Sequence, residues 1–171
     1  RLENEYNISG DFALGDPVVL IKEFYNPKVT RIKKIGIVAH YKDKELPIIK
    51  KLIKLGCGLI NIQSDSIESF IDDILQYEYV FSSSLHGLIV ADTYGIPNAR
   101  LVFSDMVAGG DFKFLDYYST TDNKSPEKLV VELDVVGQDF LLEAVKLCRI
   151  SYFLEDKEKL KNSFPISDFN G

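Results

Sequence analysis

Short apolar runs alternate with amphipathic segments along this chain. The apolar runs, rich in Ile, Val and Leu, predict buried strands at residues 35–39, 58–62, 79–81, 98–103 and 129–133. Apolar positions at helical spacing predict helices at residues 46–55, 66–76, 84–94, 111–118, 140–149 and 155–162. Continuous apolar strands separated by helices are typical of a parallel sheet covered on both faces. The pattern therefore predicts an α/β fold with a Rossmann-like parallel sheet and helices on both faces.

Two capping signals add detail to this pattern. Asp16 followed by Pro17 predicts a short helix at the start of the chain, and Ser66 is placed to cap the helix after it. No internal repeat and no Gly/Ser/Pro-rich linker divides the sequence. We therefore expect residues 1–171 to form a single domain.

Composition and charge narrow the class of protein. The chain has 171 residues, 46% of them apolar, and a net charge of −6, which gives no general attraction to nucleic acid or to an anionic membrane. Its apolar stretches are too short to span a bilayer, so we expect a soluble protein. Cys57 and Cys148 stand far apart without a CxxC or His-rich neighbourhood, which predicts neither a zinc site nor a disulfide framework.

One part of the chain is basic despite the acidic total. Residues 22–54 hold ten Lys and Arg against three acidic residues. Such a surplus either lies on a solvated helix face with its loops, or attracts an anionic ligand.

Candidate chemistry follows the predicted strand ends. Ligands of open α/β sheets bind beyond the carboxyl ends of the strands. His40 follows the first predicted strand, and His86 lies in the segment 82–87 that follows the third. These are the only histidines in the chain, and each is either a hydrogen-bonded structural residue or part of a site at this edge.

The segment 82–87 is the most informative stretch. Ser82, Ser83 and Ser84 precede a helix whose first turn presents unpaired N–H groups and the positive end of the helix dipole, which suits a phosphate or a carboxylate. His86 in that turn can donate a proton or a hydrogen bond to the anion, and Gly87 permits close approach. The alternative is ordinary helix capping by the serines.

A second helix start lies at residues 109–113. Gly109 and Gly110 form a flexible turn before Asp111, and Lys113 can reach an anion from there; alternatively, Asp111 is a plain cap and Lys113 faces solvent. Walker, GxGxxG, HExxH and nucleophile-elbow motifs are absent from the sequence. The sequence thus supports no hydrolase, kinase or metalloprotease, and no residue pattern requires a metal.

These segments resemble a known family. Residues 35–41, residues 81–98, Gly109 to Phe114 with residues 116–118, and residues 15–17 resemble the polysaccharide pyruvyl transferase family, in order from about residue 15 to 118. The Ser-Ser-x-Leu-His-Gly segment is its most recognisable part. The resemblance implies a fold similar to the C-terminal, donor-binding half of a two-domain GT-B glycosyltransferase. This chain is then expected to work with a further N-terminal domain.

The resemblance also implies an activity and a site. It implies transfer of a pyruvyl group from phosphoenolpyruvate to two hydroxyls of a sugar, forming a ketal on a bacterial exopolysaccharide, a cell-wall glycan or a lipid-linked precursor. It implies a cytoplasmic location at or near the inner membrane face, with no metal and no cofactor besides the donor. His86 is the expected general acid or phosphate ligand. The expected donor-binding groups are Ser82, Ser83, Ser84, Gly87, His40 and Lys113.

The sequence departs from the family at Ser84, where many members carry Arg. Lys113, Arg100 or a residue outside this chain then supplies the positive charge, or the donor differs. A nucleotide-sugar glycosyltransferase is the nearest alternative function, with Asp105 or Asp111 on the ribose hydroxyls. A donor-binding half with no activity of its own is the other.

Overall fold

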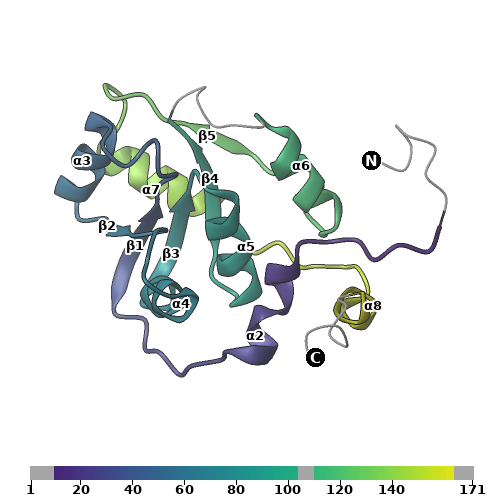
Figure 1. Cartoon of the computed structure of the whole chain (residues 1–171). Helices are drawn as coiled ribbons and strands as arrows, with labels where there is room; N and C mark the ends of the chain where they lie inside the picture. Colours follow the sequence, from purple (N-terminus) through teal and green to yellow (C-terminus); the bar gives the residue numbers. More distant parts are fainter. Residues whose placement is uncertain (1–9, 104–109, 164–171) are drawn as a thin grey trace.

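A single sheet organises the part of the chain that the computed structural model describes, residues 10–103 and 110–163 (Figure 1). Its five strands are all parallel and lie in the order β2-β1-β3-β4-β5. They are β1 (Lys33–Val38), β2 (Gly58–Ile60), β3 (Tyr77–Ser82), β4 (Asn98–Val102) and β5 (Lys128–Val130). The predicted α/β, Rossmann-like fold is confirmed.

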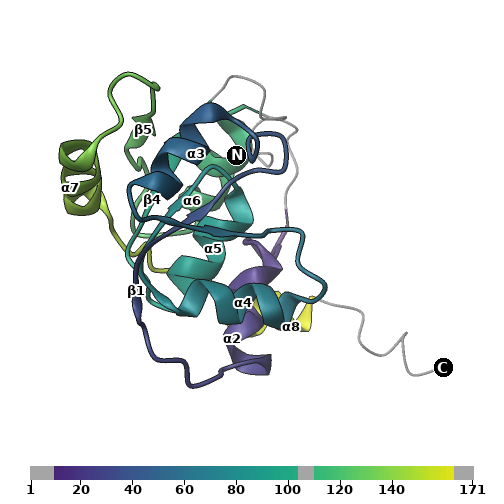
Figure 2. The ribbon, with the colours of Figure 1, turned by 90° about the vertical axis from the view of Figure 1, so that its left-hand side faces the viewer.

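Helices cover both faces of this sheet, as Figures 1 and 2 show. The main helices are α3 (Pro47–Lys54), α4 (Ile67–Leu75), α5 (Leu85–Thr93), α6 (Phe112–Ser119), α7 (Gln138–Leu147) and α8 (Lys157–Asn162). Helices α3 and α7 share a buried cluster with Ile37 of β1, whereas α4 and α5 share another with Val38. Successive residues of a strand face opposite sides, so these clusters lie on opposite faces. Within the described ranges, no helix is both long enough and apolar enough to cross a bilayer.

A third buried cluster joins the ends of the chain to α5. It contains residues of η1 (Pro17–Leu20), α5, α6 and α8, with α2 (Ile21–Phe24) continuing directly from η1. The predicted start of η1 is confirmed, because the Asp16 carboxylate accepts a hydrogen bond from the Val18 N–H at 2.9 Å and Pro17 is the first helical residue. Helix α5 is therefore enclosed on several sides, which explains its largely apolar sequence.

Several predicted element bounds were wrong, including those of β5, which spans Lys128–Val130 rather than residues 129–133, and two of the misplaced ends have identifiable reasons. Strand β2 ends at Ile60 rather than residue 62, because the side chain of Asn61 accepts a hydrogen bond from the Gln63 N–H and forms a turn. Helix α7 ends at Leu147 rather than residue 149, because Arg149 forms a pair of backbone hydrogen bonds with Asn98 instead. Both ends depend on local side-chain chemistry or on distant pairing, which hydrophobic periodicity does not report.

The strand order reverses between β1 and β3. From β1 the chain moves outward to β2, and β3 then lies on the opposite side of β1 and is followed by β4 and β5. The last residues of the two strands, Val38 and Ser82, are paired in register. Because ligands of open α/β sheets bind at such a switch point, the residues that follow Val38 and Ser82 are placed where a site is expected.

A buried carboxyl group on α5 ties three other segments together. Asp92 accepts hydrogen bonds from the Asn98 side chain (2.6 Å), the Ser151 N–H (2.8 Å) and the Tyr117 hydroxyl (3.0 Å). These partners belong to β4, the segment after α7, and α6. Burial raises the pKa of Asp92 to about 7, although the three hydrogen bonds oppose this shift.

This raised pKa predicts a pH dependence of stability. The unfolded chain releases the Asp92 proton near pH 4, whereas the folded protein keeps it until about pH 7. The unfolded state therefore binds fewer protons in this window, and the free energy of unfolding is expected to fall as the pH rises from 4 to 7. Chemical denaturation at several pH values measures this slope. The isosteric Asp92→Asn variant should lose the Asp92 contribution; an unchanged slope would assign it to other groups.

Candidate active site

The first turn of α5 has unused hydrogen-bond donors. Ser84 occupies the N-cap position, but its hydroxyl forms no capping hydrogen bond to the helix. The backbone N–H groups of Leu85, His86 and Gly87 have no acceptor within the helix at these positions. The predicted helix start is therefore present, with no side-chain cap at Ser84, and a helix N-terminus of this kind suits an anion.

Two of the predicted donor-binding residues hold this turn in place. The Ser82 hydroxyl is fully buried, lies 2.7 Å from the Ser84 carbonyl oxygen and 3.1 Å from that of Val38, and accepts the Ser84 N–H. A Cβ atom on Gly87 would lie only 2.4 Å from the Ser82 Oγ and 2.8 Å from Val38 Cγ1. Ser82 and Gly87 thus bring α5 against β1 and β3, and the Ser82 hydroxyl is occupied by backbone groups.

Ser83 joins the two loops of the switch point. Its hydroxyl accepts the His40 backbone N–H at 2.9 Å and donates to the Asp43 carboxylate at 3.0 Å. Asp43 is fully buried. Asp43 is one of the three acidic residues in the basic segment 22–54, and its position between Lys42 and Lys44 gives no sign of burial. The structure shows that it fixes the loop after β1 to the loop after β3.

His40 and Lys113 lie within electrostatic reach of each other. Burial lowers the pKa of the half-buried His40 imidazole, and the nearby Lys113 ammonium lowers it further, with Asp43 acting in the opposite direction. The pKa of Lys113 is itself lowered, by burial and then by Arg100. Burial and the Lys113 charge both favour the neutral form of the His40 imidazole, and the second of these comes from a cation that α6 supplies.

This pairing predicts a measurable shift. Replacing Lys113 by Gln is expected to raise the pKa of His40 part of the way towards its usual value, because the charge is removed and the burial stays. An NMR titration of the imidazole C–H resonances in wild type and variant measures the change. Lys157→Gln, an exposed position on α8, is the control and should leave the His40 titration unchanged. An unaltered midpoint in Lys113→Gln would contradict the proximity.

Arg100 is engaged in contacts within the protein. Its guanidinium lies 3.5 Å from the centre of the Phe114 ring and forms an ion pair with Asp111 at 2.7 Å, and Lys128 contacts the same carboxylate. The Nε of Arg100 is buried without a hydrogen-bond partner among the described residues. Lys113, by contrast, forms no ion pair with any residue in the ranges 10–103 and 110–163, so it is the better placed of the two to meet an anion.

The contacts of Arg100 and Lys128 also involve Asp111, one of the two residues expected to bind the ribose hydroxyls in a nucleotide-sugar glycosyltransferase. Hydrogen bonds from Lys128 and Arg100 lower the pKa of the Asp111 carboxyl group, so this carboxylate is already paired. It occupies the N-cap position of α6, but its side chain does not cap the helix. Asp105 and Gly109 lie outside the described residues. Gly110 has a φ of +50°, as the predicted turn requires.

Two cavities adjoin the first turn of α5. One, of about 330 Å³, is lined by Leu85, Lys113 and Tyr117 together with Asp16 and Pro17. The other, of about 400 Å³, is lined by His86 and by residues of η1, α4 and the loop before α4. His86 is exposed and forms no hydrogen bond with the described residues. His86 therefore lines a different cavity from Lys113, on the side of the turn nearer α4.

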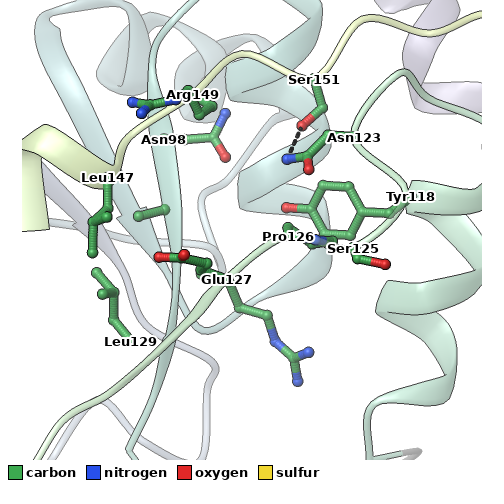
Figure 3. A pocket seen from close by; sticks show the side chains of 12 residues that line it. Asn98, Tyr118, Asn123, Ser125, Pro126, Glu127, Leu129, Leu147, Arg149 and Ser151 are labelled. Atoms are coloured by element: carbon green, nitrogen blue, oxygen red, sulfur yellow. Dashed lines mark hydrogen bonds between the residues drawn. The ribbon is translucent and has the colours of Figure 1, made fainter.

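A further cavity, of about 190 Å³, lies away from this turn (Figure 3). It is bounded by Asn98 at the start of β4, by Glu127 before β5, and by Arg149 after α7. Figure 3 shows the Asn123 side chain donating to the Ser151 hydroxyl at its rim, at 3.3 Å. These positions are at the amino ends of the strands, opposite the edge where α/β proteins bind substrates. We therefore do not place the active site there.

Comparison with known proteins agrees with the geometry. A family model described as polysaccharide pyruvyl transferase matches residues 6–103, which include His40 and the turn 82–87. An uncharacterised protein of Acanthamoeba polyphaga mimivirus is 34% identical over 114 residues, or 63% of this chain. The match covers 39% of that relative, so the chain spans about two fifths of its length. No solved structure matches the chain. Because the family model covers more than half of it, the chain belongs to the polysaccharide pyruvyl transferase family.

Proposed function

We propose that the protein containing this chain transfers a pyruvyl group from phosphoenolpyruvate to a sugar of a bacterial exopolysaccharide or cell-wall glycan. The observation that carries the proposal is the uncapped first turn of α5, at the switch point, in a chain of this family. The donor is the only small molecule besides the saccharide that the proposal needs. The expected location is the cytoplasm, at or near the inner membrane face where such precursors are assembled.

The phosphate and the carboxylate of phosphoenolpyruvate both need positively charged or hydrogen-donating partners. Residues at the carboxyl edge of the sheet can provide them. The N–H groups of the α5 turn can donate hydrogen bonds to one anion. The Lys113 ammonium, which forms no ion pair with the described residues, supplies positive charge where this sequence has Ser84 in place of the Arg that many family members carry. His40, whose pKa is lowered by burial and by the Lys113 charge, is a further hydrogen-bonding group at this edge. Ser82, Ser83 and Gly87 serve as positioning residues, because their contacts set the turn and the neighbouring loop.

The reaction can be written with its protons balanced. A sugar hydroxyl adds to C2 of phosphoenolpyruvate, the C2=C3 electron pair takes a proton at C3, and the hydroxyl proton is released. A second hydroxyl then displaces the phosphate at C2, and its proton leaves with the phosphate. The first step needs an acid beside C3, and His86 is the imidazole on the α5 turn that can supply it. Stabilisation of the phosphate lowers the barrier of the second step.

Thermal unfolding tests this assignment directly. A ligand that binds only the folded state raises its stability, so phosphoenolpyruvate is expected to raise the unfolding midpoint of the wild-type chain. Lys113→Gln should reduce that shift, while Lys157→Gln should retain it. Inorganic phosphate serves as the control for a simple anion effect. Stabilisation by UDP and none by phosphoenolpyruvate would replace the proposal with glycosyl transfer from a nucleotide sugar.

A further inference from the structure

The cavity beside His86 differs in chemistry from the cavity beside Lys113. Its apolar lining comes from η1, the loop after β2, α4 and α5. The lining residues are Val18, Ile62, Ile67, Phe70 and Val90. Its polar lining consists of His86 and the consecutive residues Ser64, Asp65 and Ser66. None of the lining residues is a Lys or Arg. The cavity thus combines an extended apolar wall with one carboxylate, two hydroxyls and an imidazole.

The hydrogen bonds within this cavity leave two side chains available. The Ser64 hydroxyl donates to the Asn61 carbonyl oxygen at 2.7 Å, and the Ser66 hydroxyl caps α4 by accepting the Ser69 N–H at 3.1 Å. Asp65 and His86 form no hydrogen bond with the residues that the structure describes. An exposed carboxylate offers two acceptor oxygens, and an imidazole offers two ring nitrogens for hydrogen bonding. Both groups are therefore free to bind a ligand.

This combination suits a neutral ligand with many hydroxyls. Small-molecule sites are mostly apolar with a few placed polar groups, and a sugar ring has apolar C–H faces and vicinal hydroxyls that can both donate to one carboxylate. Phosphoenolpyruvate fits poorly, because its two anionic groups would face Asp65 without a cation. We infer that the cavity lined by Asp65 and His86 is a subsite for the acceptor saccharide, separate from the donor site beside Lys113.

The inference rests on the proposed function and sharpens it. A donor bound at the N–H groups of the α5 turn and a sugar bound in the neighbouring cavity lie on either side of the same turn of helix. His86 belongs to that turn and lines the sugar cavity, so its imidazole can take the proton of the attacking hydroxyl and deliver that same proton to C3. Asp65 orients the sugar by accepting hydroxyl hydrogen bonds, and it is a specificity-determining residue.

NMR titration of the isotope-labelled chain tests the subsite without measuring activity. The probes are methyl β-D-galactopyranoside, methyl β-D-glucopyranoside and methyl β-D-mannopyranoside, with glycerol as a control for nonspecific hydroxyl effects. At least one glycoside is expected to shift the His86 imidazole C–H signals and the backbone amides of residues 64–67, and to leave Lys113 unaffected. Asp65→Asn should raise the dissociation constant about tenfold. Asp139→Asn, an exposed carboxylate on α7, should leave it unchanged.

The two proposals fail separately in this experiment. Phosphoenolpyruvate, titrated alone, is expected to shift the signals of Lys113 and His40 whether Asp65 is present or replaced. If it does so and none of the three glycosides shifts the signals of residues 64–67 and His86, the saccharide subsite is wrong and the donor site stands. Equal binding by Asp65→Asn, equal shifts with glycerol, or phosphoenolpyruvate shifts centred on Asp65 would also overturn the inference.

Discussion

Replacement of His86 by Ala is expected to slow pyruvyl transfer by about 100- to 10,000-fold and to leave the free energy of unfolding unchanged. The size of the loss is that typical for removal of a general acid–base group. Stability should be retained because His86 is exposed and its side chain forms no hydrogen bond with the described residues, so no buried partner is left unsatisfied. Phosphate release from phosphoenolpyruvate in the presence of acceptor, measured on the full-length protein, gives the rate.

A substitution at a nearby exposed residue, Glu68, distinguishes loss of the His86 imidazole from a general effect of mutating this surface. Glu68→Ala alters α4 near the same cavity but does not line it, and it should keep the wild-type rate. Thermal unfolding of both variants checks the fold. Wild-type transfer by His86→Ala would remove this imidazole from the mechanism and make His40 the candidate acid.

Replacing Gly87 by Ala is expected to lower the free energy of unfolding by about 1–3 kcal/mol and to disturb donor binding with it. The new methyl group would lie 2.4 Å from the Ser82 Oγ and 2.9 Å from the Val38 Cβ, closer than Cβ atoms approach such neighbours. Neither neighbour can move cheaply, because Val38 ends β1 and the Ser82 hydroxyl is bonded to backbone groups on two sides. Helix α5 must therefore shift away from the sheet.

Gly137 supplies the matched control. A Cβ there meets no atom within 4 Å, and its φ of −157° is ordinary extended backbone. Gly137→Ala should thus cost less than about 1 kcal/mol, the typical cost of losing a favourable N-cap residue. Urea denaturation compares the two variants. A Gly87→Ala protein as stable as Gly137→Ala would show that the contact between α5 and β1 tolerates a methyl group.

Much of the fold was predictable because its determinants are local. The buried part of β1, residues 35–38, is a continuous apolar run, and η1 and α4 begin where Asp16 and Ser66 provide capping oxygens. The positions of His40 and His86 just past strand ends were predictable for the same reason. Ser84 was recognisable as the residue that precedes a helix, although its unused hydroxyl was not.

The roles of the site residues depended on contacts between distant segments. The sequence placed Ser82 among the donor-binding groups, but the pairing of β1 with β3 and the close approach of α5 direct its hydroxyl to backbone partners. Asp92 looked like one polar residue in an apolar helix until three segments converged on its carboxylate. Neither role has a signal in local periodicity.

The sequence by itself thus determined the strands, the helices and the edge of the sheet that carries the candidate chemistry, since each follows from neighbouring residues along the chain. The tertiary structure alone decided which side chains meet there. It brought Lys113 within electrostatic reach of His40, paired Arg100 with Asp111, and placed His86 and Asp65 in the lining of one cavity. Strand order and helix packing decide which side chains meet, because they bring together residues that are far apart in the sequence. The separation of two residues along the chain does not predict their distance in space.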